Sequence, residues 1–429
     1  MSADSGRHFF KQAGWLVIAN LGCGLFMYAV HPLAAKMEAA EYGVFLTLLK
    51  LFLVLGIPAA GLQSVFALQT ARAQTAGAQA DLTATLRAVL WAMGGLWLVL
   101  FVAGWAASDV ICATFKISNP NALLATLGLG LTTLLLPVLR GVLQGRQDFA
   151  GLGWTLVIDG IGRFTMIVVL VAWLGGQAAS GMAASLISQL GALLLAAWVT
   201  RTVWQAERGA FQWRPWLARV VPLTLGLGAV TFISSVDTLF VQSQFPKELT
   251  RLYGAGVIVG FGLSQFTMPI ANVMFPKIAG GTGADAALRH TLLGTAALGG
   301  AVAAVCTVMP TLPLRVVYFR NPTEFLPAAP LVPWFAWSIL GLVLANVLIQ
   351  NLLARERFAI VPWLVILAAG FAGGLAWVQP KLAGVEPVAA FMMVARVLSI
   401  ACGALLLTAA WFTWGQTDSP KSKVQESEA

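Results

Sequence analysis

Charged residues are scarce in this sequence, because Asp, Glu, Lys and Arg together make up only 10% of its 429 residues. Soluble domains have about 25%. Hydrophobic residues make up 59% of the chain, and its mean hydropathy is +0.83. This composition excludes a water-soluble enzyme, a disordered chain and a small disulfide-stabilised scaffold. It requires that many apolar side chains face lipid.

Cysteine and histidine are also rare. The four cysteines are isolated in the sequence, and the three histidines form no cluster. Neither residue type has a spacing that indicates a metal site or a disulfide framework. The sequence contains no glycine-rich nucleotide-binding loop and no Ser/His/Asp arrangement. We therefore expect no cofactor and no bound ATP, which leaves an ion gradient (Na⁺ or H⁺) or the membrane potential as the energy source.

Twelve apolar stretches have the length of about 20 residues that a helix needs to cross a bilayer. The sequence thus predicts an all-α polytopic membrane protein with about twelve transmembrane helices. The stretches are 13–34, 43–65, 86–107, 122–143, 152–174, 181–200, 220–241, 253–275, 291–309, 329–350, 358–378 and 389–412.

Lys and Arg are distributed unequally between the two sides of the predicted membrane protein. The side that carries both termini has sixteen, the opposite side has seven, and three fall inside predicted spans. Cytoplasmic loops of membrane proteins carry an excess of these residues. We therefore expect both termini in the cytoplasm, in a multi-pass protein of the cell (inner) membrane. The same rule explains the net charge of +9; no dense basic cluster indicates nucleic-acid binding.

The sequence repeats itself with an offset of about 210 residues. Tyr42-Gly43 is followed by Ile57-Pro58, with Ile57 fourteen positions after Gly43, and the same spacing separates Tyr253-Gly254 from Met268-Pro269. A second pair of matching segments is 143–149 and 352–358. The repeat predicts two six-helix bundles of the same orientation, related by an axis along the membrane normal.

The predicted bundles are residues 1–200 and 220–414. A cytoplasmic interfacial linker of residues 201–219 joins them, and residues 415–429 form a polar, disordered tail. Pro58 and Pro269 lie at matching places inside apolar helices. Since proline removes a backbone hydrogen bond, we expect these positions to be kinks that act as hinges around a central site. Alternatively, they are prolines that membrane helices tolerate without a functional role.

Two segments carry a family resemblance. EYGVFLTLLKLFLVLGIPAAGLQSVF and RGVLQGRQDFAGLGWTLVIDGIGRFTMIVVLVAWLGG resemble the polysaccharide-biosynthesis (O-antigen or capsule-type) flippases of the MOP superfamily (multidrug, oligosaccharidyl-lipid, polysaccharide). The resemblance implies a V-shaped, MATE-like pair of bundles with a pseudo-twofold axis and a central cavity. It also implies alternating access, either for undecaprenyl-pyrophosphate-linked glycans or for drugs. The first span lacks the acidic residue of the drug-exporting branch, and twelve spans differ from the fourteen typical of lipid II flippases.

Charged residues inside a membrane are costly and therefore mark candidate sites. Lys50 lies in the second predicted span and Asp237 in the seventh, at similar depths. In the resembled fold these spans are neighbours across the two bundles. We expect Lys50 to attract a pyrophosphate or to pair with Asp237, in a contact that breaks and reforms during transport. Alternatively, Asp237 binds the coupling ion, or Lys50 extends toward the interface without a functional role.

Further candidates are Asp159 and Arg163, which lie four residues apart on one helix face. They form either a self-neutralising structural pair or, through Arg163, a contact with phosphate oxygens. Arg140 lies at the cytoplasmic end of its span, where it and neighbouring arginines either attract anionic headgroups or only set the topology.

The sequence favours a transporter over an enzyme. The first interpretation is a flippase of polyprenyl-pyrophosphate-linked oligosaccharides for cell-surface polysaccharide synthesis. The alternative is a cation-coupled exporter of drugs or small amphiphiles. A membrane glycosyltransferase or polymerase is a third interpretation. It requires a sizeable extracytoplasmic loop, which the sequence lacks. The expected partners are membrane lipid, the lipid-linked glycan and a glycosyltransferase or polymerase complex, with the protein itself a monomer.

Overall fold

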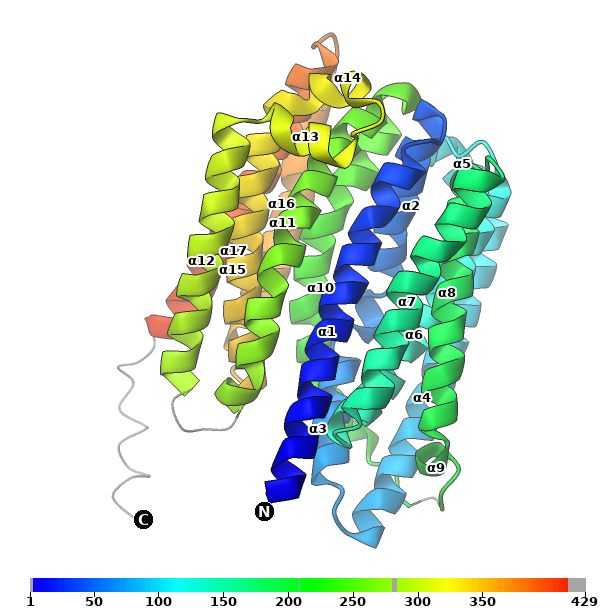
Figure 1. Cartoon of the computed structure of the whole chain (residues 1–429), viewed down its shortest axis with the longest axis vertical. Helices are drawn as coiled ribbons and strands as arrows, with labels where there is room; N and C mark the ends of the chain where they lie inside the picture. Colours follow the sequence, from blue (N-terminus) through cyan, green and yellow to red (C-terminus); the bar gives the residue numbers. More distant parts are fainter. Residues whose placement is uncertain (1–2, 208, 280–283, 416–429) are drawn as a thin grey trace.

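The computed structural model describes residues 3–207, 209–279 and 284–415, without the side chains of 3–13, 17, 265–279, 284–285 and 287. The described residues form helices and contain no strand. The predicted tail falls on residues 416–429, which lie outside the described part. Helix α1 begins and helix α17 ends toward the same end of the molecule (Figure 1), here called the lower end; α5, α13 and α14 lie at the upper end.

The first half of the chain forms a helical bundle, here called the N-lobe. Its helices are α1 (Ala3–Ala34), α2 (Ala39–Leu55), the 3-10 turn η1 (Ile57–Ala59), α3 (Leu62–Arg72), α4 (Ala76–Ala106), α5 (Ser108–Phe115), α6 (Pro120–Gly145), α7 (Phe149–Ile167) with the π-helical η2 (Val168–Trp173), and α8 (Ala178–Val199). Helix α7 packs between α1 and α8, and α6 packs on α3, α4 and α8.

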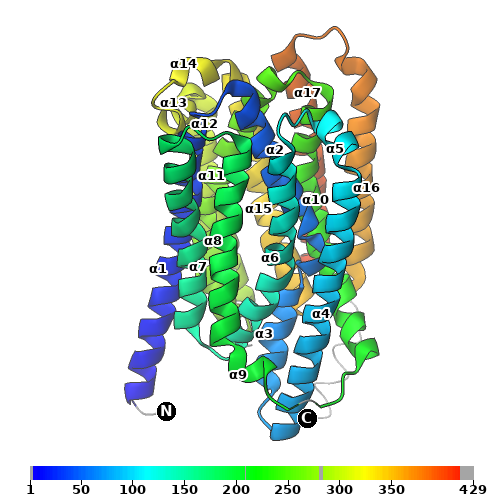
Figure 2. The same cartoon turned by 90° about the vertical axis from the view of Figure 1, so that its right-hand side faces the viewer.

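The second half forms the C-lobe. Its elements are α10 (Trp213–Gln244), α11 (Lys247–Ala279), α12 (Ala284–Val308), α13 (Thr311–Val317), α14 (Pro322–Phe325), η3 (Leu326–Leu331), α15 (Val332–Ala354), η4 (Phe358–Ile360), α16 (Val361–Val378), η5 (Gln379–Leu382) and α17 (Pro387–Trp414). Helix α15 packs on α11, α12 and α17, and α10 packs on α16. The two lobes lie side by side (Figures 1 and 2) and meet mainly where α2 packs on α10 and α11, and α1 on α11.

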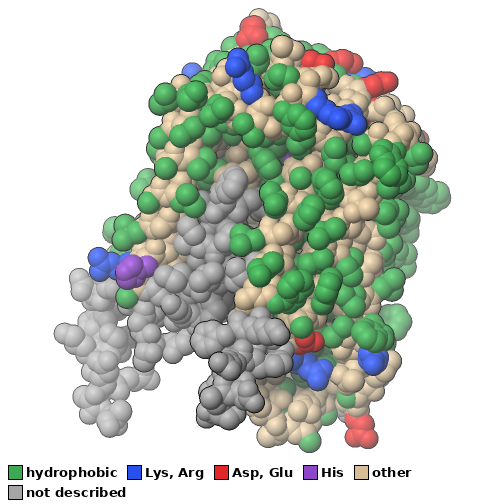
Figure 3. Space-filling view, viewed as in Figure 1, with side chains coloured by type: hydrophobic (Ala, Val, Ile, Leu, Met, Phe, Trp, Pro, Cys, Tyr) green, Lys and Arg blue, Asp and Glu red, His purple; other side chains and the backbone are tan. Residues whose placement is uncertain are grey.

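Each of the twelve predicted spans lies in a helix or in a helix with its adjoining turns. Among the described residues, ten helices are long and apolar enough to cross a membrane, and the bent pair α2–α3 makes eleven. The remaining predicted span, 253–275, lies within α11. Large apolar side chains on the outside of the bundles are widely exposed, including Trp91 at 80%, Leu407 at 73% and Leu194 at 69%. Figure 3 shows hydrophobic side chains over much of one outer face. Such a surface requires lipid, so the chain is a multi-pass membrane protein.

The connection between the lobes is anchored to the lower end of α4. Short helix α9 (Arg201–Trp204) follows α8. Thr83 donates a hydrogen bond to the carbonyl oxygen of Val203 (2.9 Å), and the Asp81 carboxylate accepts one from the backbone N–H of Ala210 (2.9 Å). Helix α10 already begins at Trp213, so residues 213–219 of the expected linker are its first two turns.

The internal repeat is visible in the backbone. Just after each of the helices α6 and α15 comes a non-glycine residue of left-handed conformation, Gln147 (φ 58°) and Glu356 (φ 56°). Each residue's N–H bonds the carbonyl three positions back, and the following N–H bonds the carbonyl five positions back. This is a Schellman cap. Because 356 − 147 is 209, the caps have the offset of the second sequence repeat.

Candidate functional site between the lobes

The repeated Tyr-Gly pairs form the crossing between α2 and α11 at the upper end. A Cβ on Gly43 would lie 2.3 Å from Oγ1 of Thr250, and one on Gly254 would lie 2.2 Å from Cδ1 of Leu46. Each glycine thus lets the helix of the other lobe approach more closely than any larger residue allows. The motif that revealed the duplication in the sequence is therefore the contact that joins the duplicated halves.

The tyrosines of the two motifs are both buried and both hydrogen-bonded. The Tyr42 hydroxyl lies 3.1 Å from the hydroxyl of Tyr318, so this bond crosses from the N-lobe to the C-lobe. The Tyr253 hydroxyl donates to Oδ2 of Asp237 (2.8 Å) within the C-lobe. A buried tyrosine needs such a partner for its hydroxyl. Tyr42 finds its partner in the other lobe, whereas Tyr253 finds its partner in its own lobe.

A cluster of polar contacts, here called the upper latch, fastens the end of α10 to the loop between α5 and α6. Lys116, the left-handed C-cap of α5 (φ 55°), donates from Nζ to the carbonyl oxygens of Gln242 and Ser243 (3.1 Å each) and to that of Phe245. These are carbonyls at a helix C-terminus, where a cation is favoured. Burial lowers the pKa of Lys116, and the negative charge of Glu248 acts in the opposite direction.

Gln242 is the centre of the upper latch and is fully buried. Its Nε2 donates to the carbonyl oxygen of Phe115 (2.9 Å), and its Oε1 accepts from Oγ1 of Thr47 (3.3 Å). Lys247 adds a bond to Ser118 (3.2 Å). The polar contacts between the described side chains of the two lobes thus gather at the upper end, which holds that end closed in this structure.

Lys50 lies between the lobes, on α2. Its Nζ donates to the backbone carbonyl oxygen of Ser234 on α10 (2.7 Å). Within the described residues no ion pair joins it to Asp237, one turn further along α10; such a pair was one of the expected alternatives. In this conformation the Lys50 ammonium is hydrogen-bonded to a backbone carbonyl, and Asp237 acts on it electrostatically without an ion-pair contact.

Asp237 is buried, with 2% of its surface exposed. Besides Tyr253, its carboxylate accepts from Oγ1 of the adjacent Thr238 (3.4 Å). No cation of the described chain forms an ion pair with it. A buried carboxylate held by two hydroxyl groups offers oxygen ligands for a small hard cation or a proton.

Asp159 joins two arginines inside the N-lobe. Its Oδ1 lies 3.2 Å from Nη2 of Arg163, and its Oδ2 lies 3.3 Å from Nη2 of Arg140. Arg140 also donates to the hydroxyl (3.1 Å) and the carbonyl (3.0 Å) of Thr155. The expectation that Arg140 faces headgroups at the cytoplasmic rim does not fit this structure, because its guanidinium is folded into the lobe. Arg163 keeps one buried donor, Nε, without a partner.

Of the two predicted hinges, one coincides with a break. Pro58 lies in η1, between α2 and α3, and the two parts of this span are bent by 42°. Gly61 and Gly228, on either side of this contact, let η1 and α3 approach α10: a Cβ on Gly228 would lie 2.6 Å from Ile57. Pro269 lies within α11, but its side chain is outside the described residues. Hinge motion at both positions stays a prediction.

Comparisons with known proteins give no match by sequence, either among family models or among curated proteins. Solved structures match over nearly the whole chain. They include a MATE transporter in complex with MaD3S (TM-score 0.66, 12% identity, 96% of each chain) and the lipid II flippase MurJ in an inward closed conformation (TM-score 0.67, 14% identity, 94% of this chain and 86% of that one). A third is a MOP superfamily transporter from Pyrococcus furiosus (TM-score 0.56, 12% identity, 98% and 96%).

The fold is that of the MOP superfamily transporters. The predicted fold class is therefore confirmed, at identities that establish the fold and leave the substrate open.

Within this MOP fold, the upper latch was not predicted from the sequence. In the sequence, Lys116 cannot be told from an ordinary loop lysine. The left-handed turn after α5 brings its side chain to the end of α10. Gln242 lies in an apolar helix without a recognisable motif. No group of three metal-ligating side chains occurs in the described part of the chain.

Proposed function

We propose that this protein moves a lipid-linked oligosaccharide with a polyprenyl-pyrophosphate headgroup across the cell membrane by alternating access of its two lobes. The proposal rests on the position of the Lys50 ammonium. It lies between the lobes on a backbone carbonyl and has no carboxylate partner among the described residues. A buried cation that forms no ion pair within the protein favours an anionic substrate group.

A second cation supports an anionic headgroup. Arg163, on α7, is buried and keeps one donor, Nε, without a partner. Asp159 carries one negative charge, whereas Arg140 and Arg163 carry two positive charges. This part of the N-lobe therefore keeps a net positive charge, which favours binding of a pyrophosphate.

The arrangement of contacts supports alternating access. The upper latch joins the lobes by hydrogen bonds from single side chains, and the bend at Pro58 lies against α10. Opening of the upper end requires these bonds to be exchanged for water and the crossing of α2 and α11 to separate. With both termini in the cytoplasm, the upper end is extracytoplasmic, so the latch is closed on the side to which a newly made glycan is delivered. Such a flippase acts alongside glycosyltransferases and a polymerase.

The test is flipping of a labelled undecaprenyl-pyrophosphate sugar in proteoliposomes, with wild type, Lys50→Met and Lys381→Met. Lys381 is a matched lysine outside the lobe interface. A hydrogen bond to a charged group contributes about 1.5–3 kcal/mol, and about 1.4 kcal/mol is a tenfold change. We expect Lys50→Met to slow flipping at least about tenfold and Lys381→Met to match wild type. Equal rates for all three proteins contradict the proposed role of Lys50.

Asp237 favours a second candidate function, a cation-coupled exporter. Its buried carboxylate has hydroxyl donors but no ion-pair partner in the described chain, as a site for Na⁺ or H⁺ requires. Several neighbours of the same fold are multidrug-resistance transporters by name. If wild type does not flip the lipid-linked sugar but expels small cations under an imposed pH or Na⁺ gradient, this second function replaces the first.

A further inference from the structure

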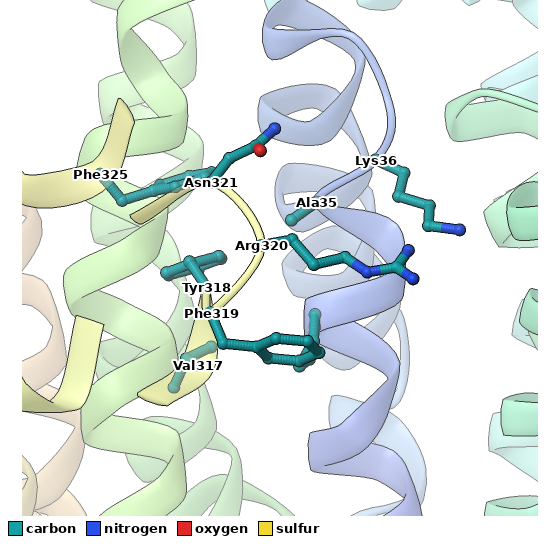
Figure 4. Close-up of a pocket in the computed structure, with 9 residues that line it drawn as sticks. Ala35, Lys36, Val317, Tyr318, Phe319, Arg320, Asn321 and Phe325 are labelled. Atoms are coloured by element: carbon teal, nitrogen blue, oxygen red, sulfur yellow. The ribbon is translucent and has the colours of Figure 1, made fainter. Parts of the chain in front are cut away.

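A pocket of about 220 Å³ opens at the upper end of the molecule, at the boundary between the lobes (Figure 4). One wall is the end of α1 and the turn after it, from the N-lobe. The other wall is the α13–α14 segment of the C-lobe. The residues that line the pocket include Lys36, Tyr318, Phe319, Arg320, Asn321 and Phe325. Because each lobe supplies one wall, whatever fills the pocket contacts both lobes.

The pocket contains two cations, one from each lobe. Lys36 and Arg320 are exposed, and their side chains extend toward the same side in Figure 4. Neither forms an ion pair or a side-chain hydrogen bond with any described residue, and the Asn321 amide is likewise unused. The nearby carboxylate of Glu324 is already paired with Arg251 (2.5 Å). Two like charges across an interface oppose its closure unless an anion lies between them.

The C-lobe wall is held in place before any ligand arrives. Tyr318 and Phe325 stack with their ring centroids 3.8 Å apart and their planes at 11°, and both are almost fully buried. The Arg251 guanidinium lies 5.5 Å from the Phe325 ring. A site whose walls are already ordered loses little conformational entropy when it binds.

We infer that this pocket binds a phosphate or diphosphate group, which bridges Lys36 and Arg320 and so holds the upper ends of the two lobes together. Arginine presents a planar fork that matches phosphate oxygens, and lysine adds a point charge. The pocket is smaller than the roughly 300–1,000 Å³ of sites for drug-sized molecules, so it accommodates the headgroup and not a glycan. The inference is independent of the proposed transport substrate.

Two sources can supply the phosphate: a lipid of the adjacent leaflet or a free anion. Val316 and Phe319, on and beside α13, are 65% and 64% exposed. Exposed apolar side chains next to a basic site are typical of contact with a membrane surface. The lipid headgroup is therefore the source that we expect to bind more tightly.

The pocket is connected to the contact between the lobes through Tyr318. Its ring lines the pocket, and its hydroxyl bonds that of Tyr42 on α2 (3.1 Å). A ligand that fixes the α13–α14 segment therefore also fixes Tyr318 against the N-lobe. By linkage, a ligand that binds only the closed arrangement shifts the protein toward it.

The test measures binding and hydrogen–deuterium exchange on the full chain. One arm titrates inorganic pyrophosphate into protein in a zwitterionic detergent. The other compares nanodiscs of phosphatidylcholine with nanodiscs that also contain phosphatidic acid. The variant is Lys36→Gln/Arg320→Gln. The matched control is Arg315→Gln/Lys381→Gln, which removes the same charge from the same end without altering the pocket.

We expect wild type and control to show slower exchange, by about threefold or more, in peptides covering residues 36–50 and 314–326 when the anion is present. The double variant is expected to lose this response, with binding weakened about fivefold for each cation removed. A response only in the nanodisc arm identifies a lipid headgroup, and one only with pyrophosphate identifies a free anion. Either supports the site.

Two results overturn the inference: no response of wild type in either arm, or an equal response of the double variant and wild type. Arg320→Glu is a second variant, which places a carboxylate opposite Lys36. It is expected to slow exchange in both segments without added anion and to abolish the response to pyrophosphate. Faster exchange than wild type in that variant contradicts the bridging role.

Discussion

Lys116 and Gln242 hold each other's backbone across the two lobes. The Lys116 ammonium binds the carbonyl oxygen of Gln242 (3.1 Å), and the Gln242 amide binds the carbonyl oxygen of Phe115, the residue before Lys116 (2.9 Å). This reciprocal contact is made by one side chain from each lobe. Since the contact joins the two lobes and not helices within one lobe, it can break without unfolding either bundle.

The first prediction concerns this contact. Lys116→Ala removes three charge-assisted bonds to the end of α10, so we expect the upper end to open more often. Hydrogen exchange of a peptide covering residues 240–250 should rise about tenfold, because such bonds contribute about 1.5–3 kcal/mol. Lys247→Ala removes a bond to one exposed serine and should have a much smaller effect. Similar exchange in both variants would show that Lys116 does not hold the gate.

The second prediction concerns the crossing of α2 and α11. Gly254→Ala places a Cβ 2.2 Å from Cδ1 of Leu46, so the helices must separate or Leu46 must move. Overpacking of this kind costs about 1–3 kcal/mol, measured as a lower unfolding temperature in detergent. Leu46→Ala should partly rescue Gly254→Ala by making room. Gly300→Ala is the control, since a Cβ there meets nothing within 4 Å.

The third prediction separates a structural from a binding role in the N-lobe. Asp159→Asn leaves Arg140 and Arg163 without their shared counter-charge, and breaking a buried ion pair from one side costs about 3–5 kcal/mol. A clearly lower unfolding temperature is expected. Arg163→Met removes the arginine that has a free donor; it should lower flipping more than stability if Arg163 contacts substrate. A loss of stability without loss of flipping would assign all three residues to the structure alone.

The fourth prediction concerns coupling to an ion. Asp237→Asn keeps the shape of the side chain but removes its charge, so it cannot bind Na⁺ or exchange a proton. Transport by this variant should no longer respond to an imposed pH or Na⁺ gradient. Tyr253→Phe, which removes one donor to Asp237, should weaken the response less. Asp109→Asn, near the upper end in α5, is the control. An unchanged gradient response in Asp237→Asn excludes this residue as the coupling site.

Some of the site was predictable because it depends on local sequence. The Tyr-Gly repeat pointed to equivalent places in the two halves, and these places proved to be the crossing of α2 and α11. The second repeat corresponds to the matching helix caps at Gln147 and Glu356. Helix ends and close helix approaches depend on a few adjacent residues, so duplication preserves them in recognisable form.

Other parts were not predictable, because they depend on which helix faces which. Lys50 and Asp237 were placed at similar depth, yet Lys50 bonds the Ser234 carbonyl and Asp237 bonds Tyr253. Arg140 has the position of a rim arginine in the sequence, but Asp159 and Thr155 draw it into the lobe. Depth along a helix follows from counting residues, whereas rotation about its axis follows from packing against neighbours.

The sequence by itself determined that this chain crosses a membrane many times, that it is built from two similar halves and where its helices lie, because hydrophobic length and local turn chemistry are properties of short segments. Only the tertiary structure decided which charges meet. It brought Lys116 to the end of α10, set Lys50 on a backbone carbonyl without an ion pair to Asp237 and placed Lys36 and Arg320 in one pocket. The residues of that pocket are up to 284 positions apart in the chain, since 320 − 36 is 284, and only the docking of the two lobes brings them together.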